Sequence, residues 1–472
     1  MTFPGSRFLL AIICSSAAFA VNPIPTVVGP PVPQAVVPGS GAFTLKVYGA
    51  NFVSGAAVNW NRSPRTTTFI SARELEAQIL ATDVAKPTAG YITVTNPPPG
   101  GGVSSSSYSL VEVHTPTATI TVGPPHVYFK GNGTFVLELS DFNNDGILDF
   151  AAEFGTEIKV LLGNGNGTFR FGSIAAYNYY NTAAIATGDF NNDGNEDLAF
   201  GADPNGPPTQ LQVNLGDGDG RFRRGSRFGH FAEANVMRFA VGDFNGDGNL
   251  DLLSLQNQTA DLSVFLGNGD GTFKHKADYN RSAFEVVTAD LNGDGKLDLA
   301  LMGTGGLFVQ LGNGDGTFQK PRQIFSNARV GCGFGRRLVV TDFNGDGITD
   351  LAYCERDSTN GKLWIMMGNG DGTFQKPVAI PIQNGIYGFS FSAGDFNSDG
   401  KTDLAVSYIT FSSSVFELFL GNGDGTFQHK KIVKLPGVFN AEEGIVPGDF
   451  NSDGLLDFIF QQPGDVSIFT QQ

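Results

Sequence analysis

Seven nine-residue segments carry residue types that can bind a metal ion. Each has the pattern Asp-x-Asn-x-Asp-Gly-x-x-Asp, and the copies begin at residues 141, 189, 243, 290, 342, 395 and 449. Carboxylates, side-chain amides and main-chain carbonyls supply the oxygen ligands that calcium prefers. The glycine at position 6 suits a sharp turn with positive φ, and the varied residue at position 7 suits a ligand that binds through its main-chain carbonyl. A simple turn favours the same residue types, but three aspartates kept in all seven copies favour calcium.

The seven segments are not EF-hand loops. An EF-hand loop has twelve positions and ends with a bidentate glutamate at the twelfth. Here the twelfth positions are Ala152, Phe200, Ser254, Leu301, Tyr353, Val406 and Phe460. The oxygen donors therefore end at the ninth position, before an apolar run that cannot bind a cation.

The composition is that of a folded, acidic protein. Only 16% of the 472 residues are charged, which argues against a disordered polyelectrolyte. The formal net charge is −16, and the 21 aspartates at positions 1, 5 and 9 of the segments are nearly half of the 46 acidic residues. Seven Ca²⁺ ions would cancel most of this charge, and no nucleic acid is expected as a partner of so acidic a chain.

The first 20 residues predict a secretory signal peptide. Arg7 is a short basic region, residues 8–14 are apolar, and Ala18-Phe19-Ala20 fits a cleavage site after Ala20. The apolar run is far shorter than the ~20 residues needed to span a bilayer, and no later segment qualifies as a transmembrane span. A lipoprotein signal at Cys14 is an alternative. We therefore expect a secreted, extracellular or cell-surface protein.

Two cysteines, Cys332 and Cys354, remain in the mature chain. Secretion permits a disulfide between them. The sequence leaves this bond open, because connectivity says nothing about the distance between the two Cβ atoms.

The spacing of the segments predicts a repeat architecture. Their first aspartates are 48, 54, 47, 52, 53 and 54 residues apart, a period typical of propellers, solenoids or arrays. A glycine-rich segment such as LGNGDGTF recurs between them at 162–169, 215–222, 266–273, 311–318, 367–374 and 420–427. Its Asn-Gly and Asp-Gly pairs are hairpin signals. Each repeat is then read as four short antiparallel strands, with a charged outermost strand that discourages further pairing.

Seven four-stranded units predict a closed β-propeller, with an open solenoid as the alternative. The last repeat ends after DVSIFTQQ and lacks its outermost strand. The stretch ATITVG at 118–123 is the candidate for that strand, and it would join the two ends of the ring. The similar GNGTF at 131–135 is too near Asp141 to belong to the repeated pattern.

The paired DFNGDG and LGNGDGTF motifs resemble the VCBS/FG-GAP repeat and are similar to the seven-bladed propeller of integrin α chains. The resemblance covers about residues 118–472. It implies that positions 1, 3, 5, 7 and 9 of each loop hold calcium on one face of the ring, with position 7 binding through its main-chain carbonyl. Integrin α chains usually carry such loops in only some blades. All seven copies keep them here, so up to seven structural Ca²⁺ ions are expected.

The implied ligands fall into seven sets of five. They are Asp141, Asn143, Asp145, Ile147 and Asp149; Asp189, Asn191, Asp193, Asn195 and Asp197; Asp243, Asn245, Asp247, Asn249 and Asp251; Asp290, Asn292, Asp294, Lys296 and Asp298; Asp342, Asn344, Asp346, Ile348 and Asp350; Asp395, Asn397, Asp399, Lys401 and Asp403; and Asp449, Asn451, Asp453, Leu455 and Asp457.

Residues 21–113 lack the repeat and predict a β-sandwich. Short strands with turn signals between them occur in FTLKVYGANFVSGAAVNWN (43–61), RTTTFIS, ELEAQILA, GYITVTN and SYSLVEV. The GANF turn and the VNWN strand resemble an IPT/TIG immunoglobulin-like domain. We place the Pro-, Gly- and Ser-rich stretch 97–107 inside this domain as a loop, which leaves a short linker at 114–117. The expected fold is all-β, with an Ig-like sandwich followed by a seven-bladed propeller at 118–472.

The turns opposite the predicted calcium loops vary in sequence, at 176–183, 201–209, 326–335, 355–362 and 407–414. Variable loops on a fixed scaffold often carry function, so the ligand face is expected there. Aromatic candidates are Tyr177, Tyr179, Tyr180, Phe228, His230, Phe231, Tyr387, Tyr408 and Phe411, and a basic cluster consists of Arg221, Arg223, Arg224 and Arg227. Packing between repeats and a solvated strand edge explain the same residues without a ligand.

No catalytic motif appears in the sequence. It contains five histidines and no H-E-x-x-H, G-x-S-x-G or P-loop pattern. The sequence therefore predicts a non-catalytic, calcium-binding adhesion or recognition protein whose partner is a carbohydrate or an extracellular protein. A polysaccharide-active lyase or hydrolase and a purely structural surface component are the alternatives, and the oligomeric state is open.

Overall fold

The chain is all-β, as predicted. A computed structural model describes residues 21–104, 109–117, 120–128, 137–177, 184–202, 209–231, 236–256, 261–280, 283–326, 338–356, 360–384, 386–410, 414–433, 444–462 and 465–472. Within these ranges the regular elements are strands, and no helix there is able to cross a membrane. The predicted signal peptide at 1–20 lies outside the described residues.

Two sheets form the N-terminal part of the structure. One has the strand order β1 (Thr26–Val27), β3 (Phe43–Ala50), β7 (Glu74–Ile79), β6 (Thr66–Ser71). The other has the order β2 (Ala35–Val36), β10 (Leu110–Val113), β8 (Thr88–Asn96), β4 (Ala57–Trp60), β5 (Ser63–Pro64), and β9 (Gly102–Val103) pairs with β8.

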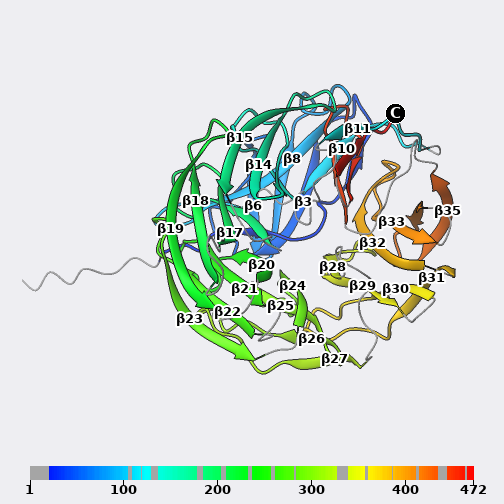
Figure 1. Cartoon of the computed structure of the whole chain (residues 1–472). Helices are drawn as coiled ribbons and strands as arrows, with labels where there is room; N and C mark the ends of the chain where they lie inside the picture. Colours follow the sequence, from blue (N-terminus) through cyan, green and yellow to red (C-terminus); the bar gives the residue numbers. More distant parts are fainter. Residues whose placement is uncertain are drawn as a thin grey trace, which may run out of the picture.

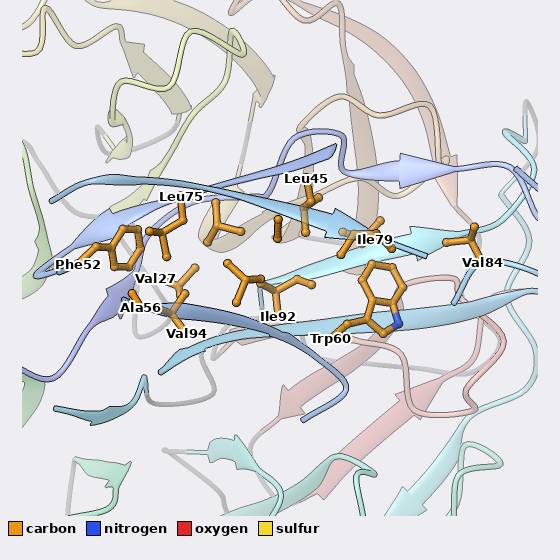
Figure 2. Close-up of a cluster of buried hydrophobic side chains, with 14 of the residues drawn as sticks. Val27, Leu45, Phe52, Ala56, Trp60, Leu75, Ile79, Val84, Ile92 and Val94 are labelled. Atoms are coloured by element: carbon orange, nitrogen blue, oxygen red, sulfur yellow. The ribbon is translucent and has the colours of Figure 1, made fainter. Parts of the chain in front are cut away.

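The alternation of apolar and polar residues explains why these two sheets pack face to face. In β7, Leu75, Ala77 and Ile79 are buried, while the glutamate and glutamine residues between them point the other way. Figure 2 shows Leu75 and Ile79 of one sheet in the same buried cluster as Trp60 and Ile92 of the other. We call this two-sheet unit the sandwich.

Seven four-stranded antiparallel sheets follow in the described residues, and Figure 1 shows them arranged around a ring. The first is β12 (Leu137–Ser140), β13 (Asp149–Phe154), β14 (Glu157–Gly163), β15 (Phe169–Tyr177), and the second is β16 (Ile185–Gly188), β17 (Asp197–Ala202), β18 (Thr209–Gly216), β19 (Phe222–Phe231). The third is β20 (Val236–Gly242), β21 (Asp251–Gln256), β22 (Asp261–Gly267), β23 (Phe273–Asn280), and the fourth is β24 (Ala283–Ala289), β25 (Asp298–Gly303), β26 (Gly306–Gln310), β27 (Arg322–Ser326). The fifth is β28 (Leu338–Thr341), β29 (Asp350–Arg356), β30 (Asn360–Met366), β31 (Val378–Asn384), and the sixth is β32 (Ile386–Gly394), β33 (Asp403–Thr410), β34 (Ser414–Gly421), β35 (Phe427–Val433). The seventh has the order β11 (His126–Tyr128), β38 (Asp465–Phe469), β37 (Asp457–Gln462), β36 (Gly444–Gly448).

The nine-residue segments determine where the strands begin. In all seven sheets the second strand of the repeat starts at the ninth residue of the segment, which is always an aspartate. The apolar run that follows is fully buried in β13, β21 and β25. The outermost strand β23 is mostly exposed and carries Lys274, His275 and Lys276, which protects the sheet edge from further pairing.

Apolar clusters join each sheet to the next. Each of seven buried clusters combines residues of two consecutive sheets, and one of them joins the seventh sheet to the first. At five junctions the phenylalanine at position 2 of a segment packs edge-on against the phenylalanine that ends a glycine-rich turn in the next sheet. Phe142 meets Phe222 in this way, and Phe450 of the last sheet meets Phe169 of the first at 5.8 Å between ring centroids. These contacts are consistent with a β-propeller.

The strand that completes the seventh sheet lies further along the chain than predicted. The outermost strand is β11, paired antiparallel with β38, whereas the expected strand was 118–123. Residues 121–123 instead pair beyond the end of β38, where Gln472 N donates to Thr121 O (2.9 Å) and Gly123 N donates to Thr470 O (2.8 Å). The register places residues 126–128 opposite residues 466–468 of β38. Residues 118, 119 and 131–135 lie outside the described residues.

Cys354 is buried on β29 and is disulfide-bonded. The sequence left open whether Cys354 forms a disulfide with Cys332, and Cys332 lies outside the described residues.

Removing the last two residues tests how the seventh sheet is completed. Gln471 N donates to Asp457 Oδ1 (2.7 Å), and Gln471 Nε2 donates to Phe396 O (3.1 Å). A chain that ends at Thr470 leaves the buried Asp457 oxygen without this donor, so its free energy of unfolding should fall by roughly 1–3 kcal/mol. Urea denaturation measures the difference. The control is Gln472→Ala, which keeps the main-chain bonds of this exposed residue and should unfold like the parent chain.

Candidate metal centres on one face of the ring

The aspartate at position 9 connects the two repeated motifs. In all seven segments its Oδ2 accepts a hydrogen bond from the main-chain N–H of position 2, at 2.9 to 3.0 Å. In six repeats its Oδ1 accepts from the N–H of the first glycine of the glycine-rich turn, at 2.7 to 2.9 Å. In the seventh repeat Gln471 N takes the place of that glycine. Each position-9 side chain is also fully buried, so these main-chain bonds replace the water that its oxygens lose.

The other predicted ligands form a loop with the same internal bonds in all seven copies. Position 1 accepts from the N–H of position 6 through Oδ2, at 2.6 to 2.9 Å. The Asn at position 3 accepts from the N–H of position 5. Position 5 in turn accepts from the N–H of position 7. The glycine at position 6 has positive φ in every loop, as the turn requires.

Burial and mutual repulsion raise the pKa of the loop carboxyls. Burial is the main cause at position 9, the carboxylates at positions 1 and 5 add to it, and main-chain hydrogen bonds oppose it. The pKa rises to about 7 in Asp149, Asp197, Asp298 and Asp350 and to about 8 in Asp251, Asp403 and Asp457. Burial also raises the pKa of every position-1 carboxyl, to about 7 in Asp395 and about 6 in Asp449.

The donor chemistry of the loops fits a hard divalent cation. Three carboxylates repel one another in each loop, and an amide oxygen and the main-chain carbonyl of position 7 lie in the same turn. In the ranges that the structure describes, no group of three or more His, Cys, Asp or Glu side chains is preformed to hold a metal. The fit therefore rests on the type of donor and on unbalanced negative charge.

The sandwich contacts this face of the ring through loops of six sheets, and Figure 1 shows its blue strands lying across the ring. The bonds in loop order are Arg62 Nη2 to Asp141 Oδ2 (2.5 Å), Ile24 N to Asp243 Oδ2 (2.9 Å), Asn51 N to Gly295 O (2.8 Å), Arg73 Nη2 to Gly347 O (2.6 Å), Gln34 Nε2 to Thr402 Oγ1 (2.8 Å) and Tyr91 Oη to Asp449 O (3.0 Å). Sequence analysis did not single out these sandwich residues. Two of them, Asn51 and Arg62, have positive φ (62° and 65°), which is uncommon for an arginine.

Of the aromatic candidates, Tyr408 belongs to the core and Phe228 is partly buried against it. Tyr408 is fully buried and donates its hydroxyl to Glu417 Oε1 (2.9 Å). Phe228 stacks on Phe273 with 4.5 Å between ring centroids. Tyr177, at the end of β15, is 64% exposed and remains a candidate for binding. Tyr179, Tyr180 and Phe411 lie outside the described residues, as do the side chains of His230, Phe231 and Tyr387.

We call the nine-residue loops that hold the predicted metal ligands the metal loops, and the arginine cluster lies beside the second of them. Arg221 pairs with Asp219, and Arg223 pairs with Asp217 and lies 3.8 Å from a carboxylate oxygen of Asp193, the position-5 residue of that loop. These pairs are largely exposed, so each stabilises the fold by little. The cluster is thus on the metal-loop side of the ring, whereas the ligand face was expected on the other side.

The FG-GAP-like repeat matches six segments of the sequence, residues 141–200, 198–254, 243–301, 290–353, 342–406 and 408–460. The chain belongs to the FG-GAP-like repeat family. The matched segments include all seven metal loops and the glycine-rich turns between them.

FG-GAP similarity extends to integrin α chains. The sequence is 28% identical to integrin alpha-PS5 of Drosophila melanogaster over 165 residues, which is 31% of this chain and 16% of that protein. It is 30% identical to integrin alpha-3 of Cricetulus griseus over 97 residues, or 18% of this chain and 9% of that protein. The chain thus spans less than a fifth of the length of these relatives.

Two solved structures are similar at low sequence identity. One is an Agrocybe aegerita protein described for its specific recognition of non-reducing terminal N-acetylglucosamine (TM-score 0.47, 16% identity, 88% of this chain and 98% of that chain). The other is a protein from Lactobacillus plantarum (TM-score 0.46, 14% identity, 72% of this chain and 94% of that chain).

The metal-free chain should become less stable as the pH rises from about 4 to about 8. An unfolded aspartate ionises near its ordinary pKa of 3.8, whereas the buried position-9 carboxyls keep their protons up to about pH 7 or 8. The folded state then binds more protons than the unfolded state across this window, so the free energy of unfolding falls with rising pH. Thermal melts of the dialysed chain measure this trend. With calcium bound, the slope should be weaker or reversed; a metal-free melting temperature that rises with pH contradicts the interpretation.

Asp251→Asn tests the bridge between the two motifs. The two carboxylate oxygens of Asp251 accept from Phe244 N and Gly267 N, each at 2.9 Å. The substitution replaces one of these oxygens by an NH2 group, which then faces an N–H donor. In calcium we expect the free energy of unfolding to fall by roughly 2 kcal/mol or more. The matched control is Asp270→Asn, on the exposed turn of the same sheet. Equal destabilisation by the two substitutions contradicts the special role of position 9.

Proposed function

We propose that the protein is a secreted or cell-surface, calcium-stabilised, non-catalytic adhesion or recognition protein. In this proposal residues 1–20 are a signal peptide, 21–113 are an IPT/TIG-type Ig-like domain, 114–117 are a linker, and 118–472 are a seven-bladed propeller of the FG-GAP/VCBS type. The observation that carries the proposal is the identical hydrogen-bonded loop in all seven repeats, with its excess of buried carboxylates.

Calcium has a structural role in this proposal. Bound at positions 1, 3, 5, 7 and 9, it supplies positive charge that balances the three carboxylates of each loop. The protein's own residues keep the loop in shape, because the main-chain N–H groups of positions 5, 6 and 7 are already bonded to side chains of positions 3, 1 and 5. Since each loop also connects the first two strands of its sheet, a stable loop stabilises the whole ring.

The ligand is expected on the face opposite the metal loops. The sandwich occupies the metal-loop face through its bonds to six loops, and alternate turns of an antiparallel sheet lie at opposite ends. The turns left on the other face are the variable ones, next to the exposed Tyr177. A carbohydrate or an extracellular protein suits such a face, since aromatic side chains stack on sugars and anchor protein interfaces.

Binding of residues 21–472 to a broad panel of polysaccharides and extracellular proteins, with calcium and with EDTA, tests this function. We expect selective binding that EDTA abolishes, and a melting temperature that EDTA lowers by about 10 °C or more, because ligands that bind only the folded state stabilise it. An unchanged melting temperature contradicts the structural role of calcium. Release of products from a polysaccharide contradicts the non-catalytic assignment.

A further inference from the structure

The sandwich forms its bonds to the ring through atoms whose positions depend on the loop conformation. Ile24 N donates to Asp243 Oδ2, and Asn51 N donates to Gly295 O. Asp243 is at position 1 of its loop and Gly295 is at position 6. These two positions are themselves linked within every loop, because the position-1 carboxylate accepts from the position-6 N–H. A change in loop shape therefore displaces the acceptors that hold the sandwich.

The glycines at position 6 also form part of the contact surface. A Cβ built on Gly295 would lie 2.6 Å from Ala72 Cβ, and one built on Gly454 would lie 2.6 Å from Thr88 O. Both glycines have φ near +80° to +90°, which the loop turn requires. The residue that allows the loop to turn is thus also the residue that allows the sandwich to approach.

A buried carboxylate of the sandwich faces the sixth loop. Glu112, on β10, is 1% exposed and accepts a hydrogen bond from Ser398 Oγ, at position 4 of that loop. Its other oxygen, Oε1, is buried and has no hydrogen-bond partner within the described parts of the chain. A buried carboxylate without a partner is destabilising. Burial raises the pKa of Glu112 well above its usual value, and the carboxylates of Asp395 and Asp403 add to this effect. A cation in the adjacent loop would favour the ionised forms of all three side chains.

We propose that the sandwich docks on the metal-loop face in a cation-dependent manner, so that divalent cations in the loops hold residues 21–113 on the ring. The inference rests on the proposed binding of calcium by the loops. Without a cation, a loop lacks the common ligand that holds its oxygens together, so positions 1 and 6 can shift, and the buried Glu112 lacks a cation beside the sixth loop. Both effects weaken the interface while the sandwich keeps its own core. Removal of calcium then opens the metal-loop face to solvent.

Hydrogen exchange of individual amides in the mature chain tests this coupling with Ca²⁺ as the ligand. The amides of Ile24 and Asn51 are bonded across the interface and report on docking. The amide of Gly267 is bonded to Asp251 and reports on the third loop. The strands β3 and β7, which pair within the sandwich, report on its own folding. We expect EDTA to speed exchange at the loop and interface amides by about tenfold or more, with the β3–β7 amides unchanged.

Substitutions in the sandwich separate the interface from the loops. Arg73→Ala removes the bond to Gly347 O and should speed exchange at Asn51 in calcium. Its matched control is Lys46→Ala, which removes a cation that pairs with Glu74 and Glu76 inside the sandwich and should leave the interface amides unchanged.

Glu112→Gln tests the charge next to the sixth loop. The amide of Thr117 donates to Asn397 O (2.9 Å). The substitution should narrow the difference between the exchange rates of this amide in calcium and in EDTA. An unchanged difference would show that Glu112 does not couple docking to the cation.

Two further outcomes distinguish this inference from the proposed function. If calcium protects the loop amides but the interface amides exchange equally in calcium and EDTA, the coupling is overturned and the proposed function stands. If calcium leaves the loop amides unchanged, calcium binding itself is overturned.

Discussion

The fold depends on one buried carboxylate in each repeat. The aspartate at position 9 accepts one hydrogen bond from its own loop and one from the glycine-rich turn 14 to 19 residues away. Both oxygens of a fully buried side chain therefore accept from main-chain N–H groups, whereas an asparagine has one acceptor oxygen and a shorter side chain does not reach both donors. This explains why the two motifs occur together in the repeats, and why the chain supplies a substitute donor, Gln471, where the last turn is missing.

The same motifs also hold neighbouring repeats together. The phenylalanine at position 2 packs against the phenylalanine of the next turn, and its carbonyl accepts a bond from a turn glycine, as Phe142 does from Gly220 N (3.0 Å). The pattern continues from the last sheet to the first, where Gly167 N donates to Phe450 O (2.8 Å). Each repeat thus buries its apolar face only when a neighbour is present, which is the general property of repeat folds.

The arrangement concentrates negative charge on one face and then covers that face with another part of the chain. Burial of carboxylates is unfavourable unless they are paired, yet the sandwich buries the position-1 residues Asp243 and Asp449 further. Its charged contacts include Arg62 at the first loop and Arg73 at the fifth, and it also places the buried carboxyl of Glu112 against the sixth loop. Calcium in the loops would remove the remaining excess of negative charge and make the covered face stable.

The sequence by itself determined the all-β class, the repeat spacing and the position of the seven nine-residue segments within the repeats. These features depend on contacts within one repeat or between adjacent repeats, and short motifs of Asp, Asn, Gly and Phe encode them. The tertiary structure decided that Tyr408 is a core residue and that Phe228 packs against the core, that β11 rather than 118–123 completes the last sheet, and that the sandwich lies on the metal-loop face. These features join residues up to 358 positions apart, such as Tyr91 and Asp449. No local pattern specifies such contacts, because they depend on the shape and charge of two surfaces that exist only after each part has folded.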